Sequence, residues 1–112
     1  MKVFISQPMS GFTDKEILTR RIELTNKIKK AYPGEEIKII DSFIEGADLN
    51  SDIIKNAPVF YLAKSLTHLS DADLVFFANG WRKSRGCKIE KYIAEEYEIP
   101  TDFELLVDLE IK

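Results

Sequence analysis

The sequence predicts an α/β protein, a three-layer sandwich in which helices cover both faces of a mostly parallel sheet of four to five strands. Short apolar runs of strand length alternate along the chain with longer segments of helical periodicity. Two runs, at 3–5 and 74–77, are apolar at every position, which is typical of strands buried on both faces of a parallel sheet. The 112 residues suit one such domain, so we expect a single domain over 1–112.

Composition narrows the functional classes. Hydrophobic residues make up 45% of the chain, enough for a packed core, and a net charge of −3 with both signs mixed argues against binding of nucleic-acid polymers. No apolar run approaches the length of a membrane span, and the first residues lack the pattern of a signal peptide. With Cys87 as the single cysteine, we expect a cytoplasmic protein without a membrane partner. No cluster has metal-ligand spacing, and we predict neither a metal nor another cofactor.

A loop and a long helix are expected after the first strand. Small and turn-forming residues fill the loop at 6–12. Thr13 and Glu16 fit a capping box at the start of the helix, and Pro33-Gly34 ends the helical pattern. The expected apolar stripe of this helix consists of Ile17, Leu18, Arg21, Ile22, Thr25, Ile28 and Tyr32.

The middle of the chain predicts a second strand, a polar connection and a second helix. The strand is expected at 37–40, with Asp41 and Ser42 at its C-terminal end. A long polar connection with about one helical turn follows at 43–56, and Pro58 suits the first turn of the next helix. The expected inner face of that helix consists of Phe60 or Tyr61 with Leu62, Leu66 and Leu69.

The strand at 74–77 leads into a loop and a third helix that carry the strongest site signals. The helix is expected to begin at Gly86, after a polar loop at 81–86, and Glu90 lies in its first turn. A helix N-terminus favours anions because its N–H groups are free, so we predict an anion site there. The cations that would support it are Arg82, Lys83, Arg85 and Lys88. The apolar face is expected from Ile89, Ile93, Ala94 and Tyr97.

Residue chemistry alone leaves two interpretations of Glu90 open. A carboxylate beside an apolar face and away from bulk water is a candidate for chemistry. Glutamate is also common in first helical turns because it suits the helix dipole. Ligands of parallel sheets bind outside the C-terminal ends of the strands, so we expect the loops 6–12, 41–42 and 79–86 to meet around one site.

A last strand is predicted near the C-terminus. Phe103, Leu105 and Val107 alternate with Glu104, Leu106 and Asp108 after a boundary at Ile99-Pro100. The polar positions of this alternation indicate a strand at an edge of the sheet.

Three segments, 3–11, 41–43 and 72–90, resemble the nucleoside 2-deoxyribosyltransferase superfamily. Its members include small, largely uncharacterised domains, the deoxyribosyltransferases proper and 2'-deoxynucleoside 5'-monophosphate N-glycosidases. The resemblance extends over nearly the whole chain, and its specific segments are the first and the third. It implies a flavodoxin-like fold, a nucleoside or nucleotide as ligand, a homo-oligomer, and a glutamate that attacks the anomeric carbon of a deoxyribosyl group.

The resemblance also implies roles for individual residues. Glu90 matches the nucleophile, and Gly86 matches the glycine four residues before it. Ser84 matches the serine that holds the 5'-phosphate in the N-glycosidases, beside the loop cation Arg85. The first substrate loop of the family corresponds to Ser6, Ser10 and Gly11.

Two positions depart from the family pattern. Lys88 stands where related enzymes usually have a second glycine, which narrows the approach of a ligand to the backbone. Ser65 stands where both enzyme types carry an aspartate that helps the base to depart, and a serine cannot act as a general acid at pH 7. The candidates to replace that acid are Asp41, Asp71 and Glu45. The hypotheses are therefore an N-glycosidase or deoxyribosyltransferase, a non-catalytic nucleotide-binding module, and a structural domain without ligand.

The remaining candidates each carry two interpretations. Asp41 is expected either to bind a ribose hydroxyl or simply to end a strand. Trp81 and Phe12 are expected either to stack on a base or to cap the apolar edge of the sheet. We interpret Cys87 as a packing residue. The helix at 58–69 carries more apolar surface than one inner face requires, which favours a homo-oligomer.

Overall fold

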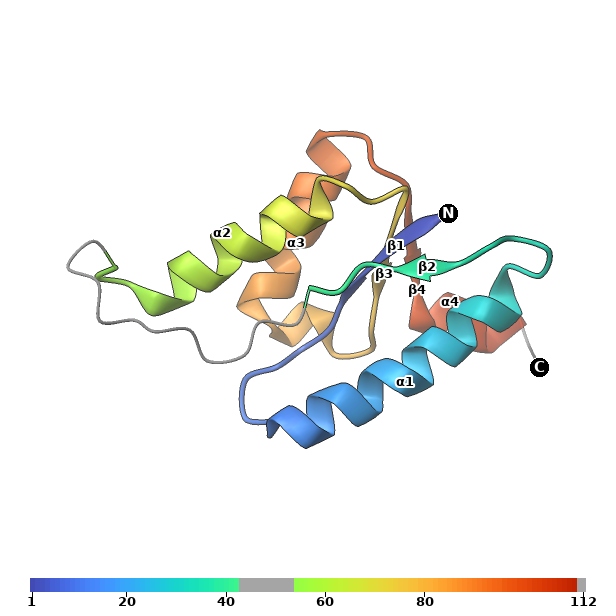
Figure 1. Cartoon of the computed structure of the whole chain (residues 1–112), viewed down its shortest axis with the longest axis horizontal. Coiled ribbons are helices and arrows are strands. Elements are labelled where there is room, and N and C mark those ends of the chain that lie inside the picture. Colours follow the sequence, from blue (N-terminus) through green and yellow to red (C-terminus); the bar gives the residue numbers. More distant parts are fainter. Residues whose placement is uncertain (43–53, 111–112) are drawn as a thin grey trace.

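The computed structural model describes residues 1–42 and 54–110; most of the predicted polar connection, including Glu45, lies outside this range. The sheet has four strands, all parallel, in the order β2-β1-β3-β4. This confirms the predicted fold class and is the strand order of a flavodoxin-like sandwich (Figure 1). The elements are β1 (Lys2–Ser6), α1 (Asp14–Ala31), β2 (Lys38–Ile39), α2 (Ala57–Leu69), β3 (Leu74–Phe77), the 3-10 helix η1 (Trp81–Lys83), α3 (Arg85–Glu96), β4 (Thr101–Phe103) and α4 (Glu104–Glu110).

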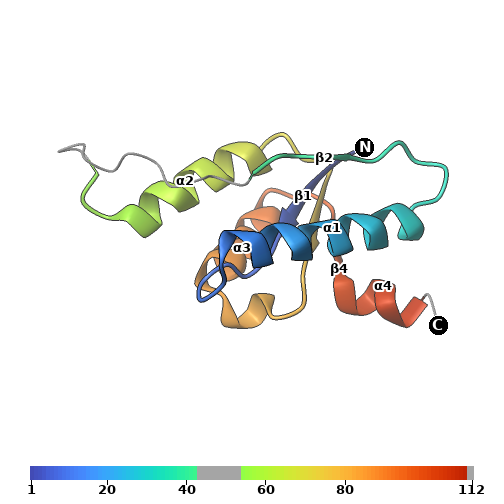
Figure 2. The same ribbon diagram turned by 60° about the horizontal axis from the view of Figure 1, so that its bottom comes forward.

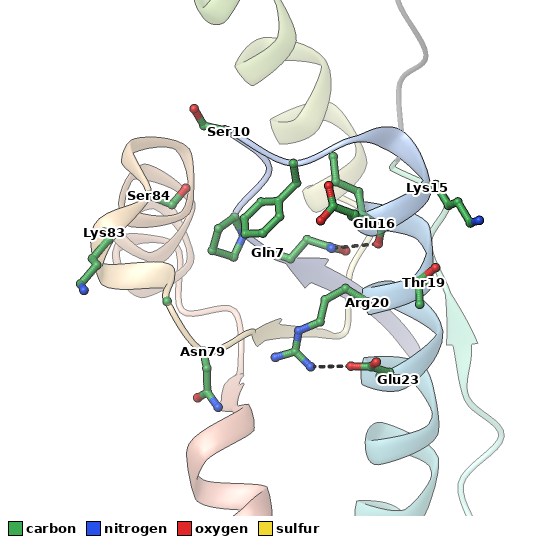
Figure 3. Close-up of a pocket in the computed structure, with 14 residues that line it drawn as sticks. Gln7, Ser10, Lys15, Glu16, Thr19, Arg20, Glu23, Asn79, Lys83 and Ser84 are labelled. Atoms are coloured by element: carbon green, nitrogen blue, oxygen red, sulfur yellow. Dashed lines mark hydrogen bonds and ion pairs between the residues drawn. The ribbon is translucent and has the colours of Figure 1, made fainter.

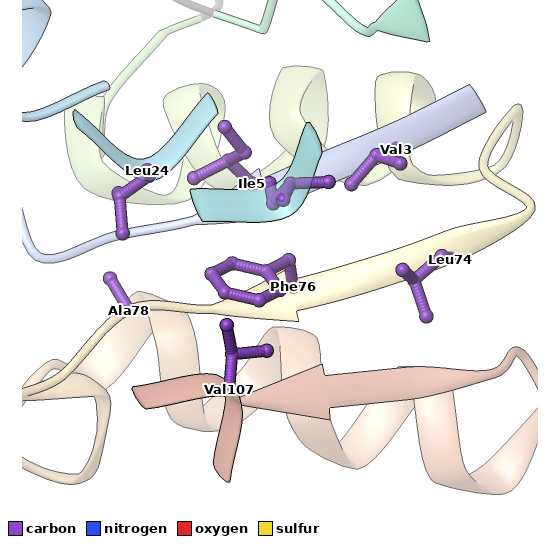
Figure 4. Packing of buried hydrophobic residues seen from close by; sticks show 8 residues of the cluster. Val3, Ile5, Leu24, Leu74, Phe76, Ala78 and Val107 are labelled. Carbon is purple, nitrogen blue, oxygen red and sulfur yellow. The ribbon is translucent and has the colours of Figure 1, made fainter. Parts of the chain in front are cut away.

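Helices cover both faces of the sheet, with α1 and α4 on one side and α2 and α3 on the other (Figures 1 and 2). Successive side chains of a strand point to opposite faces, so β1 and β3 contribute to two separate cores. The core under α1 and α4 contains Val3, Ile5, Leu24, Ile28, Leu74, Phe76, Ala78 and Val107 (Figure 4). The core under α2 and α3 contains Phe4, Leu69, Val75, Phe77 and Ala94.

The central strands β1 and β3 bring two of the predicted site loops together. They pair in register from Val3 opposite Leu74 to Ser6 opposite Phe77. Beyond the last pair, the Ala78 N–H donates to the Ser6 carbonyl at 2.9 Å. The loops that follow the two strands therefore leave the sheet side by side, as expected for a parallel sheet.

Helix α1 has the predicted start but a different buried face. The capping box of Thr13 and Glu16 is present, and the helix ends before Pro33-Gly34. The expected stripe was wrong at two positions, since Leu18 is 42% and Ile22 is 65% exposed. The buried positions follow the 3.6-residue period and are Ile17, Arg21, Leu24 and Ile28.

The last strand was predicted too far along the chain, over 103–108, whereas β4 runs over Thr101–Phe103. Strand β4 ends at Phe103, and a short helix, α4, takes up the rest of the expected alternation. Glu104 and Val107 are its buried residues, and their spacing of three is that of a helical face. The Glu104 carboxylate pairs with Arg20 and Lys27 of α1, and these ion pairs hold α4 against α1. The predicted edge position is confirmed, since β4 ends the strand order.

Helices α3 and α2, on the other side of the sheet, also bury different residues from those expected. Helix α3 begins at Arg85, one residue early, and Tyr97 is 73% exposed rather than part of the apolar face. Its buried residues are Cys87, Glu90 and Ala94, so of the expected apolar face only Ala94 is fully buried. In α2 only Leu69 of the expected inner face is buried, because the middle of the helix lines a cavity.

Candidate functional site

A cavity of about 820 Å³ lies at the C-terminal end of β1. Its walls come from the loop after β1, from the end of β2, from α2 and from the start of α3, so the three predicted loops do meet at one place. The wall residues that matter for its chemistry are Gln7, Ser10, Ser42, Ser65, Lys83, Ser84, Arg85, Gly86, Cys87 and Glu90.

Glu90 is the buried carboxyl group of this cavity. It is 6% exposed, and its Oε1 accepts a hydrogen bond of 2.7 Å from the Ser6 hydroxyl. Burial raises the pKa of Glu90 to about 7, against hydrogen bonds from Ser6 and Ser65 and the charge of Arg21, which lower it. Near neutral pH the group therefore exists in both forms, and its ionised form is a carboxylate with little competing water.

Arg21 supplies a positive charge beneath the same end of the sheet. Its Nε donates to Gln7 Oε1 at 2.9 Å, and its Nη1 donates to the Ser42 hydroxyl at 3.3 Å. Burial lowers the pKa of Arg21, while the charges of Asp41 and Glu90 raise it. The sequence prediction placed Arg21 in the apolar stripe and gave it no role. The sequence did contain an indication of such a role, because a charged residue stood within a stripe of helical spacing that was expected to be buried.

The residues of the predicted anion site are brought together in part. Ser84 caps α3, with its Oγ accepting from the Cys87 N–H at 3.3 Å, and it lines the cavity together with Lys83 and Arg85. Gly86 lines the cavity too, and a Cβ built there would meet no atom within 4 Å. The space in front of the helix start is therefore open. Two predicted cations lie elsewhere: Arg82 sits over the Trp81 ring and Lys88 does not line the cavity.

The three residues predicted for a substrate loop after β1 lie in different surroundings. Ser6 contacts Glu90, and Ser10 lines the cavity. Gly11 does neither; it has a φ of +87°, a conformation that favours glycine, in a turn closed by the Phe12 N–H and the Met9 carbonyl. The loop thus contributes one hydroxyl to Glu90 and part of the cavity wall.

Two candidates are not brought to the cavity. Trp81 packs against Phe77 and Phe103, with ring centroids 5.7 and 5.6 Å apart, so it caps the apolar edge of the sheet near β4. Asp41 is exposed and does not line the cavity, although its charge acts on Arg21. The sequence alone does not predict in which direction the side chain of an aromatic or acidic loop residue points.

Ser65, on α2, lines the cavity, and its hydroxyl lowers the pKa of Glu90. Of the carboxylates that were candidates to replace the missing acid, Asp71 pairs with Lys2 at 3.0 Å, at the opposite end of β1. Asp41 lies outside the cavity wall, and Glu45 lies outside the described residues. Among residues 1–42 and 54–110, Glu90 is thus the one carboxylate lining this cavity.

A second cavity, of about 680 Å³, lies on the other side of the β1–α1 loop. In Figure 3 the Arg20 guanidinium points from α1 toward Asn79 across this space, and Lys83 and Ser84 lie on the facing side. The acids of its wall are engaged, Glu16 with the Thr13 N–H and Glu23 with Arg20. This cavity therefore offers no counterpart of Glu90, although Phe12, 54% exposed, lines it.

Two further features are absent from the part of the chain that the structure describes. No group of three or more histidine, cysteine, aspartate or glutamate residues there could hold a metal ion. No described helix is both long and apolar enough to cross a membrane.

Residues 1–102 match a family model described as a domain of unknown function (DUF4406). The chain belongs to this family. The match spans the sheet up to the start of β4 and all residues that line the two cavities, so the Glu90 site lies within the family domain. Comparisons with curated proteins and with solved structures each found no match.

Proposed function

We propose that this protein acts on the N-glycosidic bond of a nucleoside or nucleotide through Glu90, as an N-glycosidase or a 2-deoxyribosyltransferase. The observation that carries the proposal is the buried Ser6–Glu90 pair at the wall of the larger cavity. A carboxylate that is oriented by a hydroxyl and shielded from water suits nucleophilic attack on an anomeric carbon.

The proposed reaction has two steps. A bond forms between a Glu90 carboxylate oxygen and C1' while the bond from C1' to the base nitrogen breaks, and the electron pair leaves with the base. Water, or a second base in a transferase, then attacks C1' and releases Glu90 as a carboxylate. In hydrolysis the sugar keeps the water oxygen, and a proton from that water ends on the departed base.

The start of α3 supports a phosphorylated ligand. The free N–H groups of a helix N-terminus favour anions, and Lys83 and Arg85 add positive charge at the same wall. The Ser84 hydroxyl accepts from the Cys87 N–H and can donate its own proton to a phosphate oxygen. We therefore expect a nucleoside monophosphate to bind more tightly than the nucleoside.

The alternative is a nucleotide-binding module that keeps the anion site and does not catalyse. Ser65 favours it, because this residue lines the cavity at a sequence position where the enzymes that the chain resembles carry a carboxylic acid, and a serine cannot protonate a leaving base at pH 7. In that case the Glu90 carboxylate accepts a hydrogen bond from a sugar hydroxyl. The two functions differ in one observable, the release of free base.

The test is incubation with a panel of nucleosides and nucleoside monophosphates, with and without the 2'-hydroxyl, followed by chromatography for free base. We expect release by the wild type and a loss on the order of 10³-fold or more in Glu90→Gln, since the covalent route is closed. Glu23→Gln, a change in the second cavity, is the matched control and should keep activity. Tight binding of nucleotides without any release establishes the binding module instead.

We also propose that the protein is a cytoplasmic homo-oligomer. Support comes from α2, where Val59 is 60% exposed and only Leu69 is buried, and from the single cysteine. Light scattering at micromolar concentration should give a mass of at least two chains, and a monomer mass contradicts the assembly.

A further inference from the structure

We propose that Arg21 is the positioning residue of the site: its guanidinium anchors Gln7 and Ser42, and its buried positive charge favours the ionised form of Glu90. The inference concerns the site of the proposed function, and it takes from that function only that Glu90 is the working group. It can be tested without any substrate.

The hydrogen bonds of Arg21 join three elements. Arg21 lies on α1, while Gln7 follows β1 and Ser42 follows β2, so one side chain connects the ends of two neighbouring strands to the helix. Gln7 is further fixed by its amide, which donates to the Ile17 carbonyl at 3.1 Å. The residue before Gln7 is Ser6, whose hydroxyl donates to Glu90. Holding Gln7 therefore also holds the backbone that directs Ser6 at the carboxylate.

Burial of the Arg21 guanidinium disfavours folding. Arg21 is 8% exposed, and within the described chain it forms no ion pair with a carboxylate. Its buried Nη2 has no hydrogen-bond partner among the described residues. An unpaired buried charge disfavours folding, and an apolar residue would continue the stripe of α1 more favourably. Stability therefore does not explain Arg21, whereas an effect on Glu90 does.

The charges around Glu90 single out Arg21. Among the described residues, the other titratable or charged groups nearby are Cys87 on the same helix and Lys55, Tyr61, Lys83 and Arg85 in the cavity wall. Arg21 is the cation whose charge lowers the pKa of Glu90, against the larger effect of burial. Asp41 acts one step further away, on Arg21 itself.

The experiment is an NMR titration of the full chain labelled with carbon-13, following the side-chain carboxyl carbon of Glu90. The resonance is assigned by its absence in Glu90→Gln. In Arg21→Met, which keeps a long apolar side chain, the ionisation constant of Glu90 should fall roughly tenfold, because removal of a nearby opposite charge raises the pKa of a carboxyl by about a unit. Arg20→Met is the matched control, since the adjacent guanidinium pairs with Glu104 and Glu23 on the other side of α1.

Each outcome decides the proposal. An unchanged titration of Glu90 in Arg21→Met overturns it, and so does an equal shift in Arg20→Met. If Arg21→Met does not fold, Arg21→Lys carries the test with Arg20→Lys as control. Lysine keeps the charge but cannot bind Gln7 and Ser42 through separate nitrogens, so we expect a fall of about threefold for Arg21→Lys alone. The proposed reaction can fail while this titration succeeds, because no substrate is involved.

Discussion

Replacement of Glu90 by glutamine should stabilise the protein in a pH-dependent way. Burial raises the pKa of Glu90 from its ordinary value of 4.5 to about 7. The folded protein therefore binds this proton more tightly than the unfolded chain does. Ionisation of Glu90 leaves the free energy of unfolding unchanged below about pH 4.5 and lowers it by the full amount above about pH 7. That difference in pKa corresponds to roughly 3 kcal/mol. Glutamine keeps an acceptor for the Ser6 hydroxyl and does not ionise.

The assay is urea unfolding of wild type and Glu90→Gln between pH 5 and pH 8, followed by the fluorescence of Trp81, the single tryptophan. The advantage of the variant in unfolding free energy should grow by about 2 to 3 kcal/mol over this range. A difference that stays constant with pH refutes the reasoning, because it means that Glu90 is not a buried acid with a raised pKa.

Glu104→Gln is the control, for which we expect an effect on the free energy of unfolding of opposite sign. Glu104 is 1% exposed, and although burial alone raises its pKa, hydrogen bonds from Lys27, the Asn79 N–H and Arg20 bring it below the ordinary value. Its charge therefore stabilises the fold above the unfolded pKa, and this contribution is lost as the pH falls through the folded pKa. The variant should be less stable than wild type at pH 8, with a deficit that shrinks toward acid pH.

Three further predictions follow from the site. If Glu90 is the nucleophile, kcat/KM for base release should rise about tenfold per pH unit below its pKa and level off above about pH 7; a flat profile over this range contradicts the role. Trp81→Ala should lower the unfolding free energy by about 2 kcal/mol and leave the Kd for a nucleoside monophosphate unchanged, as calorimetry would show; weaker binding would place the ring at the ligand. Burial raises the pKa of the Cys87 thiol, so a disulfide reagent should label the native protein slowly and the unfolded chain fast, and rapid native labelling would contradict its burial.

The sequence predicted the parts of the fold that local pattern determines. The fully apolar runs at 3–5 and 74–77 became the paired central strands, and the Thr13 capping box starts α1. The C-terminal run was mistaken because a short stretch of mixed polarity fits both a period of two and a helical face. What decided between them is the pairing of Glu104 with α1, a contact between residues far apart in the chain.

The sequence predicted the loops that surround the candidate site and its acid, but not the buried contacts beneath them. Glu90 stood out by its place in a helix start, and its burial beside Ser6 depends on β1 and α3 packing together. Arg21 and Gln7 were missed because their contact joins two elements whose relative placement no local pattern specifies. Trp81 was ambiguous for the same reason, since an aromatic residue in a loop can face either the sheet or a ligand.

The most direct test of the central claim is a search for the covalent intermediate on Glu90. The protein is incubated with a 2'-deoxynucleoside 5'-monophosphate that releases base, quenched in acid, and its peptides are analysed by mass spectrometry. We predict a mass increase of one deoxyribosyl phosphate on the peptide that contains Glu90 and none in Glu90→Gln. Base release that persists in Glu90→Gln at the wild-type rate, with no adduct on that peptide, would contradict the assignment of Glu90 as the nucleophile.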